Sequence, residues 1–201
     1  YNKAEIEQKI IEKYKSNFVL LYVGDTGIRR GLQTAIEATS VLKDKIPTIK
    51  LVIVGSNSSD IFLKQQVEDL NIKRYVDFEG WQNENLFPSY IMASSICISP
   101  LHRNLHHDTT YANKIFQYMS FAKPLLVSDA TSQKNIVEKA QSGLIHKAEN
   151  VDDFVEKALE LYHVEVARIK FGENGKAFIE NDFYWEKTSE KLIELYANLN
   201  E

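Results

Sequence analysis

Short apolar runs alternate along the chain with longer stretches of helical periodicity. The runs are rich in Val, Ile and Leu and lack a strict alternation of apolar and polar positions, which is typical of strands buried on both faces of a parallel sheet. Between them, apolar residues recur every three or four positions, as on one face of a helix. The expected strands are Phe18–Val23, Lys50–Val54, Tyr75–Phe78, Ile96–Ser99, Leu125–Val127 and Leu144–Ile145.

Strand and helix patterns alternate over nearly the whole chain, which is typical of a doubly wound sheet with right-handed crossovers. The pattern therefore predicts an α/β fold: a Rossmann-like parallel sheet of about six strands with helices on both faces. Two helices have well-marked apolar faces. Their expected face residues are Leu32, Ala35, Thr39 and Leu42 in the first, and Ile115, Phe116, Met119 and Ala122 in the second.

The two ends of the chain have helical patterns without the apolar strand-like runs of its middle. Residues Lys3–Tyr14 are typical of a charged amphipathic helix. Asn150 is expected to cap the N-terminus of a helix. A final helix is expected from about Trp185 onward. The apolar positions of the last two helices are Val151, Phe154, Ala158, Leu161 and Tyr162, followed by Leu192, Leu195, Tyr196 and Leu199.

Composition narrows the class of protein. The formal net charge of −4 gives no support for a nucleic-acid partner held by a broad basic surface. No apolar run approaches the roughly 20 residues that a membrane-spanning helix needs. The single cysteine, Cys97, cannot form an internal disulfide, which fits a reducing compartment such as the cytoplasm. Residues 1–201 are long enough for one domain, and because the chain opens at Tyr1 without Met we expect a piece of a longer protein.

The first segment with candidate chemistry follows the first expected strand. It holds Gly24 and Gly27, which permit sharp backbone turns, and the neighbouring Arg29 and Arg30, whose guanidinium groups suit phosphate oxygens. Ligands of open α/β sheets bind beyond the carboxyl ends of the strands, which is where this loop is expected. The alternative is an ordinary turn with two solvated arginines. The spacing is not G-x-G-x-x-G, so a dinucleotide site is not indicated.

A second segment joins the fourth strand to a helix that begins near Ala112. Amides at a helix N-terminus can bind an anion, and the hydroxyls of Thr109 and Thr110 would extend such a site. His106, His107 and Asp108 raise the alternative of a metal site, but adjacent histidines rarely point the same way and no further ligand has helical spacing to them. For these three residues, ordinary loop polarity or contact with a sugar is the favoured interpretation.

A third segment contains Pro124, which ends one helix and opens the next strand, and continues to Glu138. On its own Glu138 reads as a surface carboxylate. Taken in order, however, these segments resemble glycosyltransferase family 4 (group 1) of the GT-B fold, in its C-terminal, donor-binding domain. The matching stretches are Gly24 to Gly31, Leu51–Gly55, Val76–Gly80, Tyr90 to Pro100, Asn113 to Leu126, Ile136 to Ile145 and Phe183 to Tyr196.

The resemblance implies a retaining glycosyltransferase whose donor is a nucleotide diphosphate sugar, with no cofactor and no essential metal. It implies that Arg30 holds the diphosphate, that amides around Thr110 and Tyr111 hold the distal phosphate, and that Gly80 and Trp81 contact the base. Arg30, Asp108 and Gln117 are the implied catalytic residues. The full set of implied donor-binding residues is Gly24, Arg29, Arg30, Gly55, Gly80, Trp81, Thr109, Thr110, Tyr111, Gln117 and Glu138.

Three positions depart from the family pattern. The family often has two glutamates spaced E-x7-E, where this chain has Thr109, beside Asp108, and Gln117. Gln117 can still bond a ribose hydroxyl, without the strength of a carboxylate. The arginine common after the first glycine is Asp25 here, for which Arg29 is expected to compensate.

The resemblance also implies partners. An N-terminal domain outside this chain would hold the acceptor, a sugar or a lipid-linked glycan, in a bacterial polysaccharide setting in the cytoplasm or at the inner face of the membrane. The isolated domain is then expected to bind donor without turning it over. Two alternatives stay open: a non-catalytic nucleotide- or partner-binding domain, which the three departures favour, and a UDP-sugar 2-epimerase domain of the same architecture.

Overall fold

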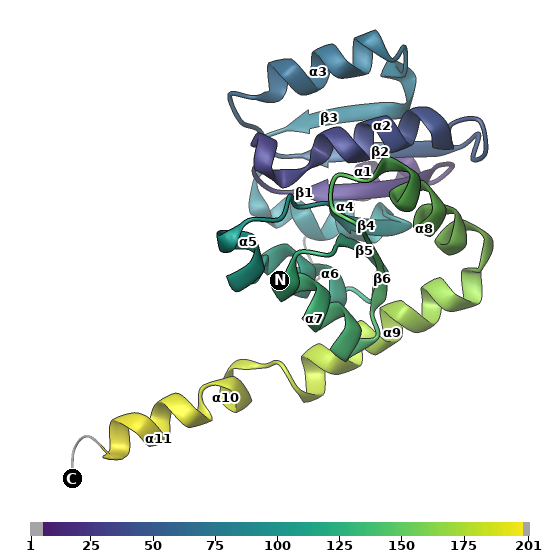
Figure 1. Ribbon diagram of the computed structural model, residues 1–201. Helices are drawn as coiled ribbons and strands as arrows, with labels where there is room; N and C mark the ends of the chain where they lie inside the picture. Colours follow the sequence, from purple (N-terminus) through teal and green to yellow (C-terminus); the bar gives the residue numbers. More distant parts are fainter. Residues whose placement is uncertain (1–5, 199–201) are drawn as a thin grey trace.

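A six-stranded, entirely parallel sheet forms the centre of the molecule, seen here in a computed structural model that describes residues 6–198 (Figure 1). The strand order is β3-β2-β1-β4-β5-β6. This confirms the expected doubly wound sheet. The strands are β1 Phe18–Val23, β2 Ile49–Val54, β3 Val76–Gly80, β4 Ile96–Ser99, β5 Leu125–Ser128 and β6 Gly143–His146.

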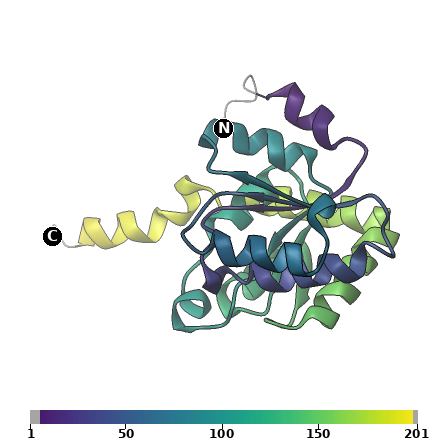
Figure 2. The same ribbon diagram turned by 90° about the horizontal axis from the view of Figure 1, so that it is seen from above.

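Helices cover both faces of the sheet (Figure 2). The α-helices are α1 Gln8–Tyr14, α2 Leu32–Leu42, α3 Asp60–Asp69, α4 Phe87–Ala93, α5 Leu105–Thr109, α6 Asn113–Ser120, α7 Thr131–Ala140, α8 Val151–His163, α9 Glu165–Asn181, α10 Trp185–Thr188 and α11 Glu190–Asn198. Short 3-10 helices are η2 Ile28–Arg30, η3 Lys73–Tyr75 and η4 Glu84–Leu86. No helix among residues 6–198 is both long and apolar enough to cross a membrane.

Strand β1 explains why the apolar runs lack alternation. All six of its residues are buried, and they divide between two cores. Leu20 and Tyr22 belong to the core on the side of α2, α3 and α8, whereas Val19 and Leu21 belong to the core on the side of α4, α6 and α7. Because both faces are covered, both sets of side chains must be apolar.

The order of the strands places a switch point between β1 and β4. The chain moves from β1 outward to β2 and β3, then returns to the other side of β1 at β4. The chain after β1 and after β4 therefore leads to helices on opposite faces, and doubly wound sheets bind their ligands at the carboxyl ends of two such strands. We call the carboxyl ends of β1 and β4, with Gly24 and residues 100–112, the rim. The fold selects the rim as the first place to look for a ligand.

Several expected elements need correction at their ends. Ala122 does not lie on a helix face: it follows α6 with a positive φ of 53°, in a turn where Ala122 N–H donates to the Met119 carbonyl and Lys123 N–H to the Tyr118 carbonyl. The first helix begins at Gln8 rather than Lys3, and residue 3 lies outside the described residues.

The C-terminal helices are separate and exposed. α10 and α11 extend away from the body of the molecule (Figure 1), so the expected single helix from Trp185 is divided in two. Trp185 is 71% exposed and Tyr196 62%. Leu199 lies outside the described residues. The N-cap expected at Asn150 is confirmed, because its side-chain oxygen accepts a hydrogen bond from Asp153 N–H.

Candidate functional site

The loop after β1 is organised around Asp25. Its carboxylate accepts hydrogen bonds from Arg30 Nε at 3.1 Å, from Asn57 Nδ2 at 2.7 Å and from Gly27 N–H at 3.3 Å. Burial pushes the pKa of Asp25 upward, but these hydrogen bonds outweigh it and leave the pKa lowered. Asp25 is therefore a structural anchor that holds the Arg30 guanidinium at the end of β1, a role that its place in the sequence did not reveal.

Gly31 lets this loop pack against the segment after β4. Its φ is +73°, and a Cβ there would lie 1.8 Å from the carbonyl oxygen of Pro100, so no other residue fits. Beside it, His102 N–H donates to the Arg29 carbonyl at 3.0 Å. The two loops that flank the switch point are thus joined directly, with the Arg29 side chain exposed and Arg30 half-buried.

The ends of β1, β2 and β3 are brought together by glycine backbone. Gly24 N–H donates to the Val54 carbonyl at 2.8 Å, and Gly55 N–H donates to the Gly80 carbonyl at 2.7 Å. A Cβ on Gly55 would lie 1.9 Å from the Gly24 carbonyl oxygen. Three of the glycines expected in the site thus share one rim. Trp81 follows directly after Gly80 and is 75% exposed. It lines a cavity of about 470 Å³ together with Gln82, Asn83, Glu84, Asn85 and Phe87.

Helix α6 faces the rim with an open N-terminus. Its N-cap residue, Ala112, provides no side-chain hydrogen bond, and its first turn holds no acidic residue. The helix is pinned by Tyr118, whose hydroxyl accepts a hydrogen bond from Val23 N–H at 2.9 Å. One turn earlier, Lys114 lies on the same side, with its ammonium nitrogen 3.5 Å from the centroid of the Tyr22 ring. The uncapped amides and Lys114 both favour an anion here.

The hydroxyls and amides expected just before α6 are largely occupied. Thr109 Oγ1 donates to the Leu105 carbonyl at 2.7 Å, and Thr110 N–H donates to the His106 carbonyl at 2.9 Å, so both complete helix α5. Tyr111 is half-exposed and lies edge-on to Phe116, with ring centroids 5.8 Å apart. The anion-binding amides are therefore better sought one turn later, at the start of α6, than at Thr110.

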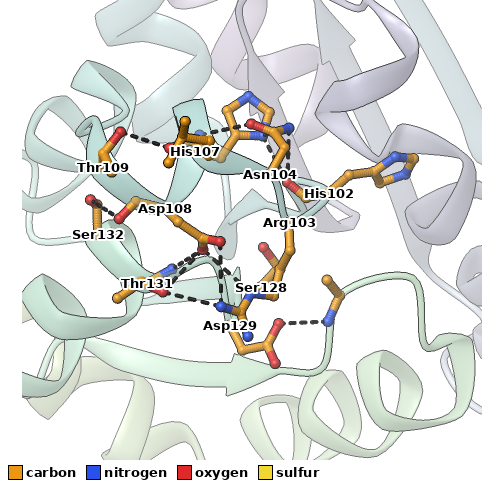
Figure 3. A network of polar contacts seen from close by, with 12 residues as sticks. His102, Arg103, Asn104, His107, Asp108, Thr109, Ser128, Asp129, Thr131 and Ser132 are labelled. Carbon is orange, nitrogen blue, oxygen red and sulfur yellow. Dashed lines mark hydrogen bonds and ion pairs between the residues drawn. The ribbon is translucent and has the colours of Figure 1, made fainter.

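Asp108 has a structural role in place of the expected catalytic one. Its Oδ1 accepts hydrogen bonds from the N–H and the hydroxyl of Thr131 at 2.7 and 3.0 Å, and Arg103 NH2 lies 3.3 Å from its Oδ2 (Figure 3). Thr131 is the first residue of α7, so the carboxylate caps that helix and favours its dipole. The hydrogen bond from Thr131 N–H lowers the pKa of Asp108, with further lowering by Arg103.

Of the two remaining expected site residues, Glu138 lies apart from the rim, whereas Gln117 lies on α6. Glu138 lies near the end of α7, beside a cavity of about 410 Å³ that Gly143 and Phe171 also line. Gly143 begins β6, so Glu138 is at the amino end of the sheet, because a crossover helix runs antiparallel to the strands it connects. The structure therefore removes Glu138 from the donor site. Gln117 lies on α6, one turn after Asn113, and is half-buried.

The adjacent histidines do not converge. His107 is buried, with Nδ1 2.8 Å from the His102 carbonyl, while the His106 ring is tilted by 56° at a centroid distance of 5.4 Å. Within residues 6–198, no group of three His, Cys, Asp or Glu side chains is arranged to hold a metal ion. Burial lowers the pKa of His107, and the nearby Arg30 lowers it further.

A larger hollow lies at the amino ends of the strands, on the opposite side of the sheet from the rim. It measures about 750 Å³ and is lined in part by Lys13, Lys50 and Arg74. Its lysines are already paired: Lys13 lies 2.6 Å from Glu79, and Lys50 lies 3.0 Å from Asp77. Because these two lysines are neutralised by neighbouring carboxylates, the hollow is less suited to an anion than the switch-point rim, where an ammonium group lacks a hydrogen-bond partner among the described residues.

The chain belongs to the glycosyl transferases group 1, whose family model matches residues 3–178. The assignment to group 1 made from the sequence is thereby confirmed. EpsD of Bacillus subtilis strain 168, whose name calls it a glycosyltransferase, is 22% identical over 194 residues, which is 95% of this chain and 49% of that protein. A glycosyltransferase of Methanocaldococcus jannaschii, MJ1178, is 25% identical over 184 residues, or 90% of this chain and 48% of that protein.

Solved structures share the fold. Sucrose-phosphate synthase of Thermosynechococcus elongatus superposes with a TM-score of 0.83 at 19% identity, over 99% of this chain and 49% of that one. Anabaena HepE, solved in complex with UDP, superposes with a TM-score of 0.85 at 15% identity, over 98% of this chain and 54% of HepE. The chain spans about half the length of the curated relatives that it matches and of these two solved structures.

Proposed function

We propose that this chain is the donor-binding domain of a glycosyltransferase and that its ligand is a nucleoside diphosphate sugar. One observation carries the proposal: Arg30, in the loop after β1, acts electrostatically on Lys114 in the uncapped first turn of α6, and Lys114 lies beside Gly24 at the carboxyl end of β1. Guanidinium groups and helix N-termini both bind phosphate. Membership of the group 1 family supports the same function.

The reaction we propose is transfer with retention of configuration, as in family 4. The bond between the sugar's anomeric carbon and the distal phosphate oxygen breaks, and its electron pair stays on that oxygen. The acceptor's hydroxyl oxygen forms the new bond to the same carbon and passes its proton to the departing phosphate oxygen. Negative charge grows on the departing nucleoside diphosphate, so Arg30 and the α6 amides would stabilise the transition state more than the ground state.

The remaining parts of the site are assigned within the same proposal. The base would lie near Gly80 and Trp81, beside the 470 Å³ cavity, and Gln117 would contact the ribose. UDP is the first nucleotide to test, because HepE was solved with it. The acceptor, a sugar or a lipid-linked glycan, would be held by an N-terminal domain at the cytoplasmic side of a membrane. This chain alone is then expected to bind donor without turnover.

Isothermal titration of the chain with UDP, GDP and ADP tests the proposal. We expect one of them to bind, and Arg30→Ala to weaken that binding by about 1.5–3 kcal/mol, the usual value of a charge-assisted hydrogen bond. Arg74→Ala, the same substitution at the opposite edge of the sheet, is the matched control and should leave affinity unchanged. Absence of binding by all three nucleotides to the folded chain would refute the proposal.

A non-catalytic domain is the second candidate, and the structure offers one observation in its favour. Asp108, the carboxylate nearest the position of the family's first glutamate, is used to cap α7. Such a domain could bind a nucleotide without transferring its sugar. Assaying donor hydrolysis or transfer by the longer protein that contains this domain would distinguish the two, since a non-catalytic domain predicts nucleotide binding with neither activity.

A further inference from the structure

The side chain of Lys114 places a buried amino group over the ring of Tyr22. Its ammonium nitrogen is buried and has no hydrogen-bond partner among the described residues. It lies 3.2 Å from the position that a Cβ would occupy on Gly24, at the point where β1 ends. Buried ammonium groups are normally paired, because removing them from water is costly. An unpaired one at a ligand rim indicates that its partner is the ligand.

The charges around Lys114 make it the available cation of the rim. Arg30 is paired with Asp25 at 3.1 Å, so part of its charge is neutralised within the protein. Burial lowers the pKa of Lys114 well below its ordinary value, Arg30 lowers it further, and Asp25 opposes the change. The neighbouring tyrosine hydroxyls are occupied. The Tyr22 hydroxyl donates to the Asp25 carbonyl at 2.5 Å, and the Tyr118 hydroxyl accepts a hydrogen bond from Val23 N–H.

We propose that Lys114 is a diphosphate-binding residue, whose ammonium group moves from its place over Tyr22 to contact the phosphates of a nucleoside diphosphate beside Gly24. This inference rests on the proposed function and adds a residue to it. An ammonium group has three donors and no acceptor, so it suits phosphate oxygens. Gly24 has no side chain to block the short path, and the α6 amides lie on the same turn as Lys114. Lys114, not the exposed Arg29, then complements Arg30.

A purely structural role makes the opposite prediction. If Lys114 served the fold, its charge should contribute to stability. Its aliphatic stem can pack against Tyr22 without the ammonium, and a methionine of similar length would fill the same space without a desolvated charge. Replacing the charge should therefore leave stability unchanged or raise it while binding is lost, because residues kept for function often cost stability.

The test is isothermal titration of UDP into wild type, Lys114→Met and the control Lys73→Met, with thermal unfolding of each. Lys73 is an exposed lysine on η3, at the opposite edge of the sheet. We expect Lys114→Met to weaken UDP binding about ten- to a hundredfold, with a melting temperature at or above that of the wild type. Affinity within twofold of the wild type in a folded Lys114→Met variant would overturn the inference.

A measurement on the wild type decides the matter even if Lys114→Met fails to fold. In a chain labelled with ¹³C,¹⁵N-lysine, the side-chain resonances of Lys114 are titrated with pH, with and without UDP. A bound diphosphate favours the charged ammonium, so UDP should raise the pKa of Lys114. Identical titrations with UDP bound would overturn the inference while leaving the proposed function intact. A wild-type chain that binds no UDP, GDP or ADP would instead refute the proposed function itself.

Discussion

At the scale of single residues, two carboxylates of the candidate site bind groups of the protein itself. Asp25 holds Arg30 and the loop after β1, and Asp108 holds the start of α7. Both have a lowered pKa because hydrogen-bond donors surround them in the fold. Their negative charge is thus part of the structure, and it should be visible in the pH dependence of stability.

Asp108→Asn should lower the free energy of unfolding at neutral pH. Because the pKa of Asp108 is depressed in the folded state, its ionised form stabilises the fold above the unfolded pKa, and that contribution is lost as pH falls through the folded value. Urea unfolding from pH 7 down to pH 2 should show the wild type and the variant converging at acid pH. Glu173→Gln, at an exposed position of α9, is the control. A difference that stays constant with pH would contradict the capping role.

Ala122→Gly should stabilise the protein. Ala122 has a φ of 53°, a conformation that glycine adopts without strain, at the turn that ends α6. We expect a gain of about 0.5–1 kcal/mol, because relief of the left-handed strain exceeds the entropy that glycine adds to the unfolded chain. Ala177→Gly, within α9, should have the opposite sign. Equal losses for both variants in urea unfolding would contradict this account.

These residues mark where prediction from the sequence ends. The Gly24–Gly31 segment could be placed in the site because its neighbours in sequence are also its neighbours in space. The hydrogen bond of Asp108 with Thr131 joins residues 23 apart, and the ring contact of Lys114 with Tyr22 joins two different elements. Contacts between residues far apart in the chain produce no periodicity or spacing in the local sequence, so the sequence alone does not predict them. For Lys114 the sequence held one signal, a lysine in the first turn of a helix expected near the site. Only the fold shows that its amino group is buried beside Gly24.

At the scale of elements, α6 is the part that connects the core to the site. Tyr118 bonds the backbone of β1, Met119 and Ile115 are fully buried, and the open first turn reaches the rim. The strands and the helices α2, α6 and α8 were predictable because their burial imposes a repeating pattern. The longest described helix, α9, was not predicted, because two of its three buried residues are glycines. The short α5 and η2 were not predicted, because three to five residues hold too little periodicity and their hydrogen bonds depend on the loops around them.

Tyr118→Phe tests whether α6 positions the site. The substitution leaves the buried Val23 N–H without its partner, which should lower the free energy of unfolding by about 1–3 kcal/mol. It should also weaken UDP binding several-fold, because the first turn of α6 and Lys114 are held by this anchor. Tyr184→Phe, at a partly exposed tyrosine outside the rim, is the control. Reduced stability with unchanged UDP affinity would show that the anchor does not position the site.

At the scale of the whole molecule, the described residues form hollows at both ends of the strands, and the charges at the carboxyl ends favour an anion more than those at the amino ends. The amino edge has the larger cavity, about 750 Å³, yet its lysines are paired with carboxylates. The carboxyl edge has the switch point, the uncapped helix and the unpaired Lys114. The strand pattern made the fold predictable, and the fold then selects the edge, because doubly wound sheets bind ligands at the switch point.

A crystal structure of the chain with UDP tests this choice most directly. The account predicts the diphosphate beside Gly24, with its oxygens within hydrogen-bond distance of Arg30, Lys114 and the first-turn amides of α6, and the base toward Trp81. UDP bound in the cavity at the amino edge, among Lys13, Lys50 and Arg74, would contradict it.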